Sequence, residues 1–270
     1  MSDPGLLAPQ RRALILEDVR RDGVVRVAEL VDRLGVSALT IRRDLELLAR
    51  SGAVEKVHGG AVLTDGASVV EPRFEAKAVL QSEAKAAVAN AAAALVDPGG
   101  VVAISAGTTA FAVASRLLDV PRLTVVTNSL PVAELLRTAA RERGDAAPAL
   151  LVTGGTTTRS AALVGPLADQ GIRSLNVDLL VLGAHGVSER AGLTTPNLAE
   201  AQTNRALVSC ARRVMVVADH TKWDVVGLSG FAALAEADVF VTDAYLDDRA
   251  RAVLGKAVGE LIVVTGPVHG

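Results

Sequence analysis

The sequence has one cysteine, few aromatic residues and no long apolar run. Cys210 is the only cysteine among 270 residues, which excludes an internal disulfide and a cysteine-based zinc cluster and is typical of a reducing cytoplasm. We expect it to be a small buried hydrophobic residue. Aromatic residues make up only 2% of the chain, so the pattern does not favour base stacking on an aromatic surface. No apolar stretch reaches the ~18 residues of a membrane span and no basic, apolar leader opens the chain, so we expect a cytoplasmic protein without metal, cofactor or membrane partner.

A large excess of positive charge is also missing, since the formal net charge is only -2. The charge is unevenly distributed, however. Residues 8–63 carry ten Lys and Arg against eight Asp and Glu. The N-terminal part is therefore the candidate for binding nucleic acid, and the positions of its arginines matter more than the small excess.

The N-terminal part has helical periodicity in two neighbouring segments. Residues 10–21 predict a first helix, and Val27, Leu30, Val31 and Leu34 recur at the spacing of a second amphipathic helix. After a short turn, Ser37 is placed to cap a third helix that runs to about residue 50. This order predicts a helix-turn-helix.

The third predicted helix has one apolar face and one polar face. Ile41, Leu45 and Leu48 share the face that packs, and the opposite face is free to contact a duplex. The second helix of a helix-turn-helix lies in the major groove with its first turns at the base edges, so the candidate DNA contacts are Ser37, Ala38, Leu39, Thr40, Arg42 and Arg43. The alternative is that two adjacent arginines on an exposed face are merely solvated.

Residues 54–63 change to the alternation of a hairpin, with Gly59 and Gly60 as its two-residue turn. Such a hairpin completes a winged helix-turn-helix. Lys56 and His58 would then lie beside the DNA backbone or minor groove, although a lone histidine in a hairpin can also be an ordinary surface residue.

The rest of the chain predicts a separate α/β domain. Residues 64–70 are small and polar and predict a linker, which gives a DNA-binding domain at 1–63 and a second domain at 71–270. Residues 71–96 predict a helical region. Short apolar runs then alternate with helix-length segments, which is typical of a parallel sheet covered on both faces. The predicted strands are residues 101–104, 123–127, 150–153, 179–182, 214–218, 239–242 and 261–264.

The first of these strands leads into a loop suited to an anion. Ser105, Gly107, Thr108 and Thr109 follow it and precede a helix. Small residues let a phosphate approach the backbone, and a helix N-terminus offers free N–H groups. Many α/β turns share this composition, so the loop alone does not establish phosphate binding.

Two motifs make a family resemblance specific. The run Ser37-Ala38-Leu39-Thr40-Ile41-Arg42-Arg43-Asp44-Leu45, followed by Val57-His58-Gly59-Gly60-Ala61, resembles the signature of the DeoR family of bacterial repressors. The later segments look like that family's sensor domain, which is similar in fold to ribose-5-phosphate isomerase and glucosamine-6-phosphate deaminase. The resemblance covers nearly the whole chain and implies a repressor of sugar metabolism genes that a phosphorylated sugar releases from its operator.

The resemblance also implies roles for individual residues. Gly107, Thr108 and Thr109 match the family's phosphate loop, and Lys222 matches a lysine that pairs with the anion or a sugar hydroxyl. The candidates for polar sugar contacts are Asp178, His185 and Glu200. Each has an ordinary alternative: a cap at the start of a strand, a satisfied loop histidine, and a first-turn helix residue. Ser105 stands where the family usually has Asp, and Ala110 where a third Thr is common.

Two other functions stay open at this point. The second domain could retain isomerase or deaminase activity, with Glu200 and Asp178 as acid and base and Lys222 stabilising an enediolate. No dense acidic cluster supports this, so we expect no enzyme. A DNA-binding scaffold without ligand is disfavoured by the glycine-rich loops. Paired DNA half-sites call for a symmetric homodimer or homotetramer, assembled through the second domain.

Overall fold

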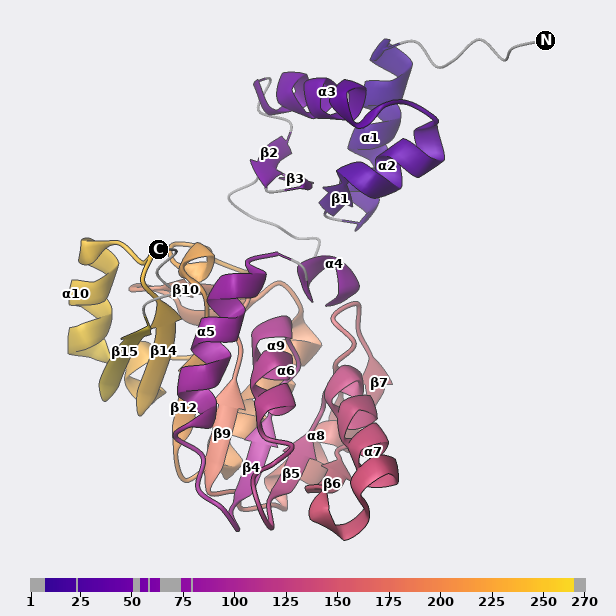
Figure 1. The fold of residues 1–270 in the computed structure, drawn as a ribbon. Coiled ribbons are helices and arrows are strands. Elements are labelled where there is room, and N and C mark those ends of the chain that lie inside the picture. Colours follow the sequence, from indigo (N-terminus) through magenta and orange to yellow (C-terminus); the bar gives the residue numbers. More distant parts are fainter. Residues whose placement is uncertain are drawn as a thin grey trace, which may run out of the picture. The chain divides into compact units, whose positions relative to one another are not determined.

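The computed structural model describes residues 8–22, 24–50, 54–57, 59–63, 74–78 and 80–264. The chain divides into two compact units, residues 1–80 and 81–270 (Figure 1). The described residues of each unit have hydrophobic clusters of their own. The predicted linker at 64–70 lies outside the described residues, so the predicted domain boundaries stay predictions. Among the described helices, none has both the length and the apolar character needed to cross a membrane.

The N-terminal unit combines helices with a three-stranded antiparallel sheet. Its elements are α1 (Ala8–Asp22), β1 (Val24–Arg26), α2 (Val27–Leu34), α3 (Ala38–Arg50), β2 (Val54–Val57), β3 (Gly60–Leu63) and α4 (Phe74–Ala78). β3 pairs with both β1 and β2. The predicted winged helix-turn-helix is therefore confirmed, with one correction: Gly60 is the first residue of β3, paired with Val57, rather than the second residue of the turn.

The core of this unit forms from the predicted apolar stripes. Ile41, Leu45 and Leu48 of α3 cluster with Ile15 and Val19 of α1. Burying branched side chains of this size stabilises a fold by about 1.5–3 kcal/mol each. The packed face of α3 thus holds the helix in place and leaves its other face exposed.

The C-terminal unit is an α/β domain. Its elements are α5 (Ser82–Ala93), β4 (Val101–Ile104), α6 (Thr108–Arg116), β5 (Thr124–Thr127), α7 (Leu130–Arg143), η1 (Gly144–Ala146), β6 (Ala149–Val152), β7 (Thr156–Thr157), β8 (Leu163–Val164), α8 (Pro166–Arg173), β9 (Leu179–Leu182), β10 (Gly186–Ser188), β11 (Gly192–Thr195), α9 (Leu198–Cys210), β12 (Val214–Val217), η2 (His220–Lys222), β13 (Ser229–Ala232), η3 (Leu234–Glu236), β14 (Val239–Asp243), α10 (Asp248–Ala257) and β15 (Glu260–Val264).

A seven-stranded parallel sheet with the order β15-β14-β12-β9-β4-β5-β6 forms the centre of this unit. All seven predicted strands lie in it. One buried cluster includes residues of α5, α6 and α7, and another includes residues of α8, α9 and α10. On β9, Leu180 and Leu182 belong to one cluster while Leu179 and Val181 belong to the other. This alternation confirms a sheet covered on both faces.

Three details differ from the sequence prediction. The predicted helical region 71–96 contains two separate helices, α4 and α5, because Gln81 before α5 has a left-handed backbone with φ 52° that a helix interior does not accept. The ribbons β7-β8 and β10-β11-β13 were not predicted. Finally, β6 is exposed along its whole length, although its apolar sequence predicts burial.

Candidate functional sites

The exposed face of α3 carries the predicted DNA contacts. Arg42 and Arg43 are exposed, and Leu39 is 58% exposed although it is large and apolar. Ser37 is exposed as well, and its Oγ accepts a hydrogen bond from the N–H of Thr40 at 3.2 Å, which confirms the predicted helix cap. Ala38 and Thr40 are half-buried. The first two turns of α3 therefore offer both positive charge and an apolar side chain to a groove.

Two buried carboxylates hold α3 and α2 against α1. Asp44 of α3 is 3% exposed and accepts a 2.5 Å hydrogen bond from Nε of Arg11. Asp18 of α1 pairs in the same way with Arg33 of α2 at 2.6 Å. Sequence reasoning missed these pairs, although a charged residue between the apolar positions of α3 was a signal for Asp44. The pairs fix the helix orientation on which groove contacts depend.

The hairpin places Lys56 on the exposed side of β2, whereas His58 lies outside the described residues. Gly60 lies where β3 passes close to β1. A Cβ atom at this position would lie 2.0 Å from the carbonyl oxygen of Val25, which is a backbone atom that cannot rotate away. The hairpin therefore requires glycine at residue 60.

Replacing Gly60 with alanine should lower the free energy of unfolding of the N-terminal unit by about 1–3 kcal/mol, because strands β1 and β3 must separate to admit the methyl group. Thermal unfolding of the full chain measures this change. Gly255→Ala is the matched control, since a Cβ there meets nothing within 4 Å and alanine favours a helix interior. Equal melting curves for Gly60→Ala and the wild type would contradict the close approach.

The second candidate site lies where the order of strands along the chain reverses. β4 leads through β5 to β6 on one side, while β9, β12, β14 and β15 follow on the other. Ligands of parallel sheets bind at such a switch point, beyond the carboxyl ends of the strands. The loops that follow β4 and β9 meet here, and they contain the predicted residues Ser105, Gly107 and His185. Thr108 and Thr109 begin α6 directly after the first of these loops.

The loop after β4 presents an uncapped helix N-terminus. Gly107 is the N-cap of α6, with φ 138°, and offers no side chain to the first N–H groups of the helix. These N–H groups therefore remain available to an anion. Thr108 is half-buried and Thr109 is 6% exposed. Ala110 is fully buried and packs in the core.

Hydrogen bonds fix the shape of this loop. Ser105 is 1% exposed, and its Oγ accepts the N–H of Gly183 from the loop after β9 at 2.9 Å. Asn128, at the end of β5, accepts the N–H of Ala106 at 3.1 Å and donates to the carbonyl of Leu163 at 3.1 Å. Ser105 is thus a link between two loops. Sequence reasoning missed this role of Asn128.

Glu200 forms the centre of a hydroxyl network. It lies in the first turn of α9 and is 8% exposed. One carboxylate oxygen accepts hydrogen bonds from Thr158 and Ser160, and the other accepts one from Thr195 at 3.2 Å. Along the chain, Thr158 and Ser160 precede α8 and Thr195 follows it. Glu200 therefore ties the loop after β7 to α9. This arrangement favours the ordinary, structural alternative for Glu200.

Removing the Glu200 carboxylate should destabilise the chain, because three hydroxyls would lose their acceptor. We expect Glu200→Ala to lower the free energy of unfolding by about 1–3 kcal/mol, measured by urea unfolding. Glu142→Ala, at an exposed position of α7, serves as the control and should change nothing measurable. An unchanged midpoint for Glu200→Ala would show that the network adds no stability.

Asp178 lies apart from the other residues of the predicted effector set. It precedes β9 and lies at the amino edge of the sheet, where its Oδ2 accepts the N–H of Val101 at 2.9 Å. The predicted phosphate loop follows the last residue of β4, at the carboxyl edge. A four-residue strand spans roughly 13 Å, so Asp178 is not brought together with the loop and instead caps a strand, the alternative left open above.

Lys222 lies in η2, directly after β12 at the carboxyl edge, near the buried carboxylate of Asp219. Burial raises the pKa of Asp219, but the charges of Lys222 and Lys85 and hydrogen bonds from Thr221 hold that pKa below its ordinary value. Both lysines therefore favour the ionised form of the Asp219 carboxyl group. Lys85 comes from α5 and is 5% exposed; sequence reasoning missed it because it lies far from Asp219 along the chain.

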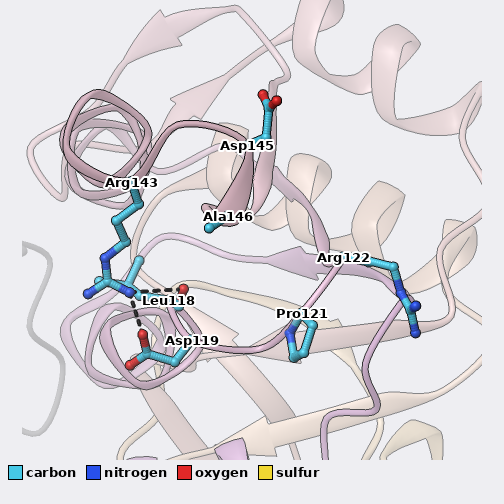
Figure 2. A pocket seen from close by; sticks show the side chains of 7 residues that line it. All are labelled: Leu118, Asp119, Pro121, Arg122, Arg143, Asp145 and Ala146. Atoms are coloured by element: carbon cyan, nitrogen blue, oxygen red, sulfur yellow. Dashed lines mark hydrogen bonds and ion pairs between the residues drawn. The ribbon is translucent and has the colours of Figure 1, made fainter.

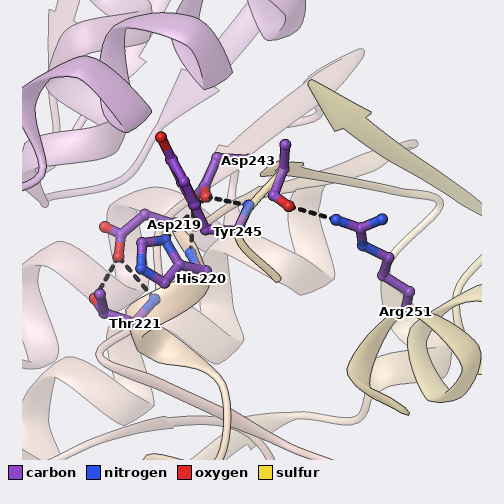
Figure 3. A network of polar contacts seen from close by, with 7 residues as sticks. Asp219, His220, Thr221, Asp243, Tyr245 and Arg251 are labelled. Atoms are coloured by element: carbon purple, nitrogen blue, oxygen red, sulfur yellow. Dashed lines mark hydrogen bonds and ion pairs between the residues drawn. The ribbon is translucent and has the colours of Figure 1, made fainter. Parts of the chain in front are cut away.

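A second carboxylate, that of Asp243, belongs to the last residue of the neighbouring strand β14 (Figure 3). Asp243 is 2% exposed and accepts hydrogen bonds from the backbone N–H of His220 at 2.8 Å and of Tyr245 at 3.0 Å. Its Oδ1 also lies 2.9 Å from Nδ1 of His220. The imidazole is thereby held in one orientation beside the ring of Tyr245, which is 75% exposed. The predicted set missed all three residues.

A surface hollow lies at the opposite, amino edge of the sheet, between the ends of α6 and α7 (Figure 2). Its lining residues are Leu118, Asp119, Pro121, Arg122, Arg143, Asp145 and Ala146. Within it Arg143 pairs with Asp119 and donates to the carbonyl of Leu118 at 3.2 Å. None of the predicted effector residues lines this hollow, so we assign it no role.

Comparisons with known proteins match both units. Residues 11–66 match a family model described as the DeoR-like helix-turn-helix domain, and residues 80–244 match the DeoR C terminal sensor domain. The chain is 37% identical over 259 residues to the uncharacterized HTH-type transcriptional regulator YgbI of Escherichia coli (strain K12), covering 96% of this chain and 98% of that protein. It is 36% identical to the transcriptional repressor AccR of Agrobacterium fabrum, with 86% and 88% covered.

A third relative is the glycerol-3-phosphate regulon repressor of Escherichia coli (strain K12), 34% identical with 87% of this chain and 90% of that protein covered. Among solved structures, the chain matches ribose 5-phosphate isomerase A of Methanocaldococcus jannaschii at 19% identity and a TM-score of 0.37, over 52% and 53% of the two chains. That structural likeness is too low to bear on function.

Proposed function

Because this chain belongs to the DeoR family of DNA-binding transcriptional regulators, we propose that it represses genes of sugar or carbohydrate metabolism and leaves its operator when a phosphorylated sugar binds. One observation supports both halves of this proposal. The same chain carries an arginine-bearing exposed helix face in a winged helix-turn-helix and an uncapped helix N-terminus at the switch point of a parallel sheet.

The DNA half of the proposal rests on α3 and the hairpin. We assign base contacts to the first turns of α3, with Arg42 and Arg43 reaching guanine edges or phosphates and Leu39 touching a thymine methyl group. Lys56 and His58 contact the backbone or minor groove. Protein dimers of this type bind half-sites about 34–36 Å apart, so we propose a homodimer or homotetramer that works in the cytoplasm on duplex operator DNA.

The effector half rests on the carboxyl edge of the sheet. We propose that the phosphate binds the N–H groups at the start of α6 together with the hydroxyls of Thr108 and Thr109. Lys222 and His185 face the same edge of the sheet and contact the anion or the sugar hydroxyls. Ser105 and Glu200 act by holding the loops in position, since both are already bonded within the protein.

Release follows from a difference in affinity. A ligand that binds better to the arrangement unable to hold DNA shifts the population toward that arrangement by the same factor. A 100-fold difference in affinity corresponds to about 2.7 kcal/mol of coupling and lowers the occupancy of an operator from about 90% to about 10%.

Retained isomerase or deaminase activity is the less favoured function. It requires two carboxyl groups near one substrate. Asp178 lies at the amino edge of the sheet, opposite the predicted effector loops. The Glu200 carboxylate already accepts hydrogen bonds from three hydroxyl groups. We therefore propose that the second unit senses a sugar phosphate without turning it over.

The proposal is tested with the full chain and duplexes selected from random sequence. Fluorescence anisotropy should show specific binding that weakens steeply with salt, because phosphate neutralisation releases counterions. Adding a panel that includes glycerol 3-phosphate and ribose 5-phosphate should release the duplex for one member, and that member should raise the melting temperature. Binding that is absent or indifferent to salt contradicts the repressor, and turnover of a panel member contradicts the pure sensor.

A further inference from the structure

We propose that two copies of this chain pair through the open edge of β6, which joins their seven-stranded sheets across a twofold axis. This proposal rests on the proposed function, because binding to paired DNA half-sites requires a symmetric assembly. The surface of that assembly is the edge of β6, and the partner bound there is a second copy of this chain.

β6 is an exposed apolar edge. It is the last strand of the sheet among the described residues. Leu150 is 36% exposed, and Leu151 and Val152 are each 41% exposed. Proteins usually protect an open edge with charge, proline or a covering segment. Residues 149–152 carry no charge, and the nearest proline, Pro148, precedes the strand rather than interrupting it. The opposite edge strand, β15, begins with the exposed Glu260 and its other residues are half-buried.

The backbone of β6 is directed for pairing on its open side. The N–H groups of Ala149 and Thr153 donate to carbonyls of the β5 side, at 2.9 and 3.1 Å. Because backbone groups alternate along a strand, the N–H and C=O of Leu150 and Val152 are directed away from β5. The backbone N–H and C=O groups of these two residues could form hydrogen bonds with another strand.

A second β6 fits this edge when it runs antiparallel. With the twofold axis at Leu151, Leu150 of each copy pairs with Val152 of the other and exchanges two hydrogen bonds, while the two Leu151 side chains lie opposite each other as a non-hydrogen-bonded pair. The nearest charged residues along the chain, Asp145 and Arg159, lie at least four residues beyond the ends of β6. No like charges therefore meet within the paired strands.

Symmetry favours a second copy over an unrelated partner. A twofold contact uses one surface twice, so that surface must be complementary to itself. An uncharged strand with a leucine at its centre, flanked by two residues whose backbone groups are directed outward, meets this condition. The two half-sites of a duplex require the same symmetry from the protein.

The test is the mass of the full chain in solution, measured by sedimentation at tens of micromolar. We expect the wild type to sediment as a dimer or tetramer, and Leu151→Glu and Leu151→Lys each to sediment with half that mass, because like charges would lie opposite each other. An equal mixture of the two variants should recover the wild-type mass. Leu228→Glu, at a leucine that is 66% exposed outside β6, should leave the mass unchanged.

A second variant tests the backbone contact. Leu150→Pro removes an N–H that is directed away from β5, so it should halve the mass while the far-ultraviolet spectrum and melting temperature stay near those of the wild type. A monomeric wild type, or full mass in Leu151→Glu, would overturn the proposal. A monomer that still binds its selected duplex contradicts only this inference, whereas a dimer that binds no duplex contradicts only the proposed repressor.

Discussion

Replacing Arg42 and Arg43 together with alanine should weaken operator binding by about 100-fold. Each side chain is exposed on the side of α3 that we propose enters the groove, and one bidentate arginine contact to guanine contributes about 1–3 kcal/mol of discrimination. Since the packed face of α3 is untouched, the melting temperature should stay constant. Fluorescence anisotropy on the selected duplex measures the loss, and the slope of affinity against salt should fall if either arginine contacts a phosphate.

The matched control for the double variant is Arg212→Ala, which removes an exposed arginine from the other unit. It tests whether any lost positive charge weakens binding to a polyanion. The two single variants then separate reading from positioning. A variant that lowers affinity for all duplexes equally has lost a phosphate contact, whereas one that relaxes the preference at one base pair has lost a base contact. Equal affinity for the double variant and the wild type would refute the assignment of α3 as the reading helix.

Local patterns explain why most of the fold could be predicted. Ile41, Leu45 and Leu48 repeat at the helical period. Ser37 caps the helix through a hydrogen bond with Thr40, which lies only three residues away along the chain. The seven strands are short apolar runs separated by helices, so their existence follows from composition along the chain. Such signals need no knowledge of which strand lies beside which.

Features that depend on distant neighbours could not be predicted. The exposure of β6 follows from its position at the end of the sheet, and the same apolar run in a central strand would be buried. The partners of Glu200 at residues 158 and 160 lie about 40 positions away, and Lys85 is still farther from Asp219. Asp178 is a different case, because a residue that precedes a strand always lies at its amino edge, and that signal was present in the sequence.

Replacing Thr108 and Thr109 with valine should leave operator binding intact and abolish its relief by the effector. Valine keeps the volume of threonine while removing the hydroxyl group, so the loop and the half-buried start of α6 are expected to keep their shape. Two hydrogen bonds to a charged group contribute about 1.5–3 kcal/mol each, which predicts an effector affinity lower by at least 100-fold. The helix N–H groups alone should retain only weak binding.

The measurement is the effector concentration that releases half of the bound duplex. Thr138→Val, at an exposed position on α7, is the control and should titrate like the wild type. The double variant also separates the two halves of the proposed function, because the residues changed lie in the unit that does not carry α3. If the effector still releases the duplex from the double variant as it does from the wild type, residues 105–109 are not the phosphate site and Lys85 and Lys222 near Asp219 become the next candidates. If the double variant fails to bind the duplex without effector, the loop supports assembly rather than sensing.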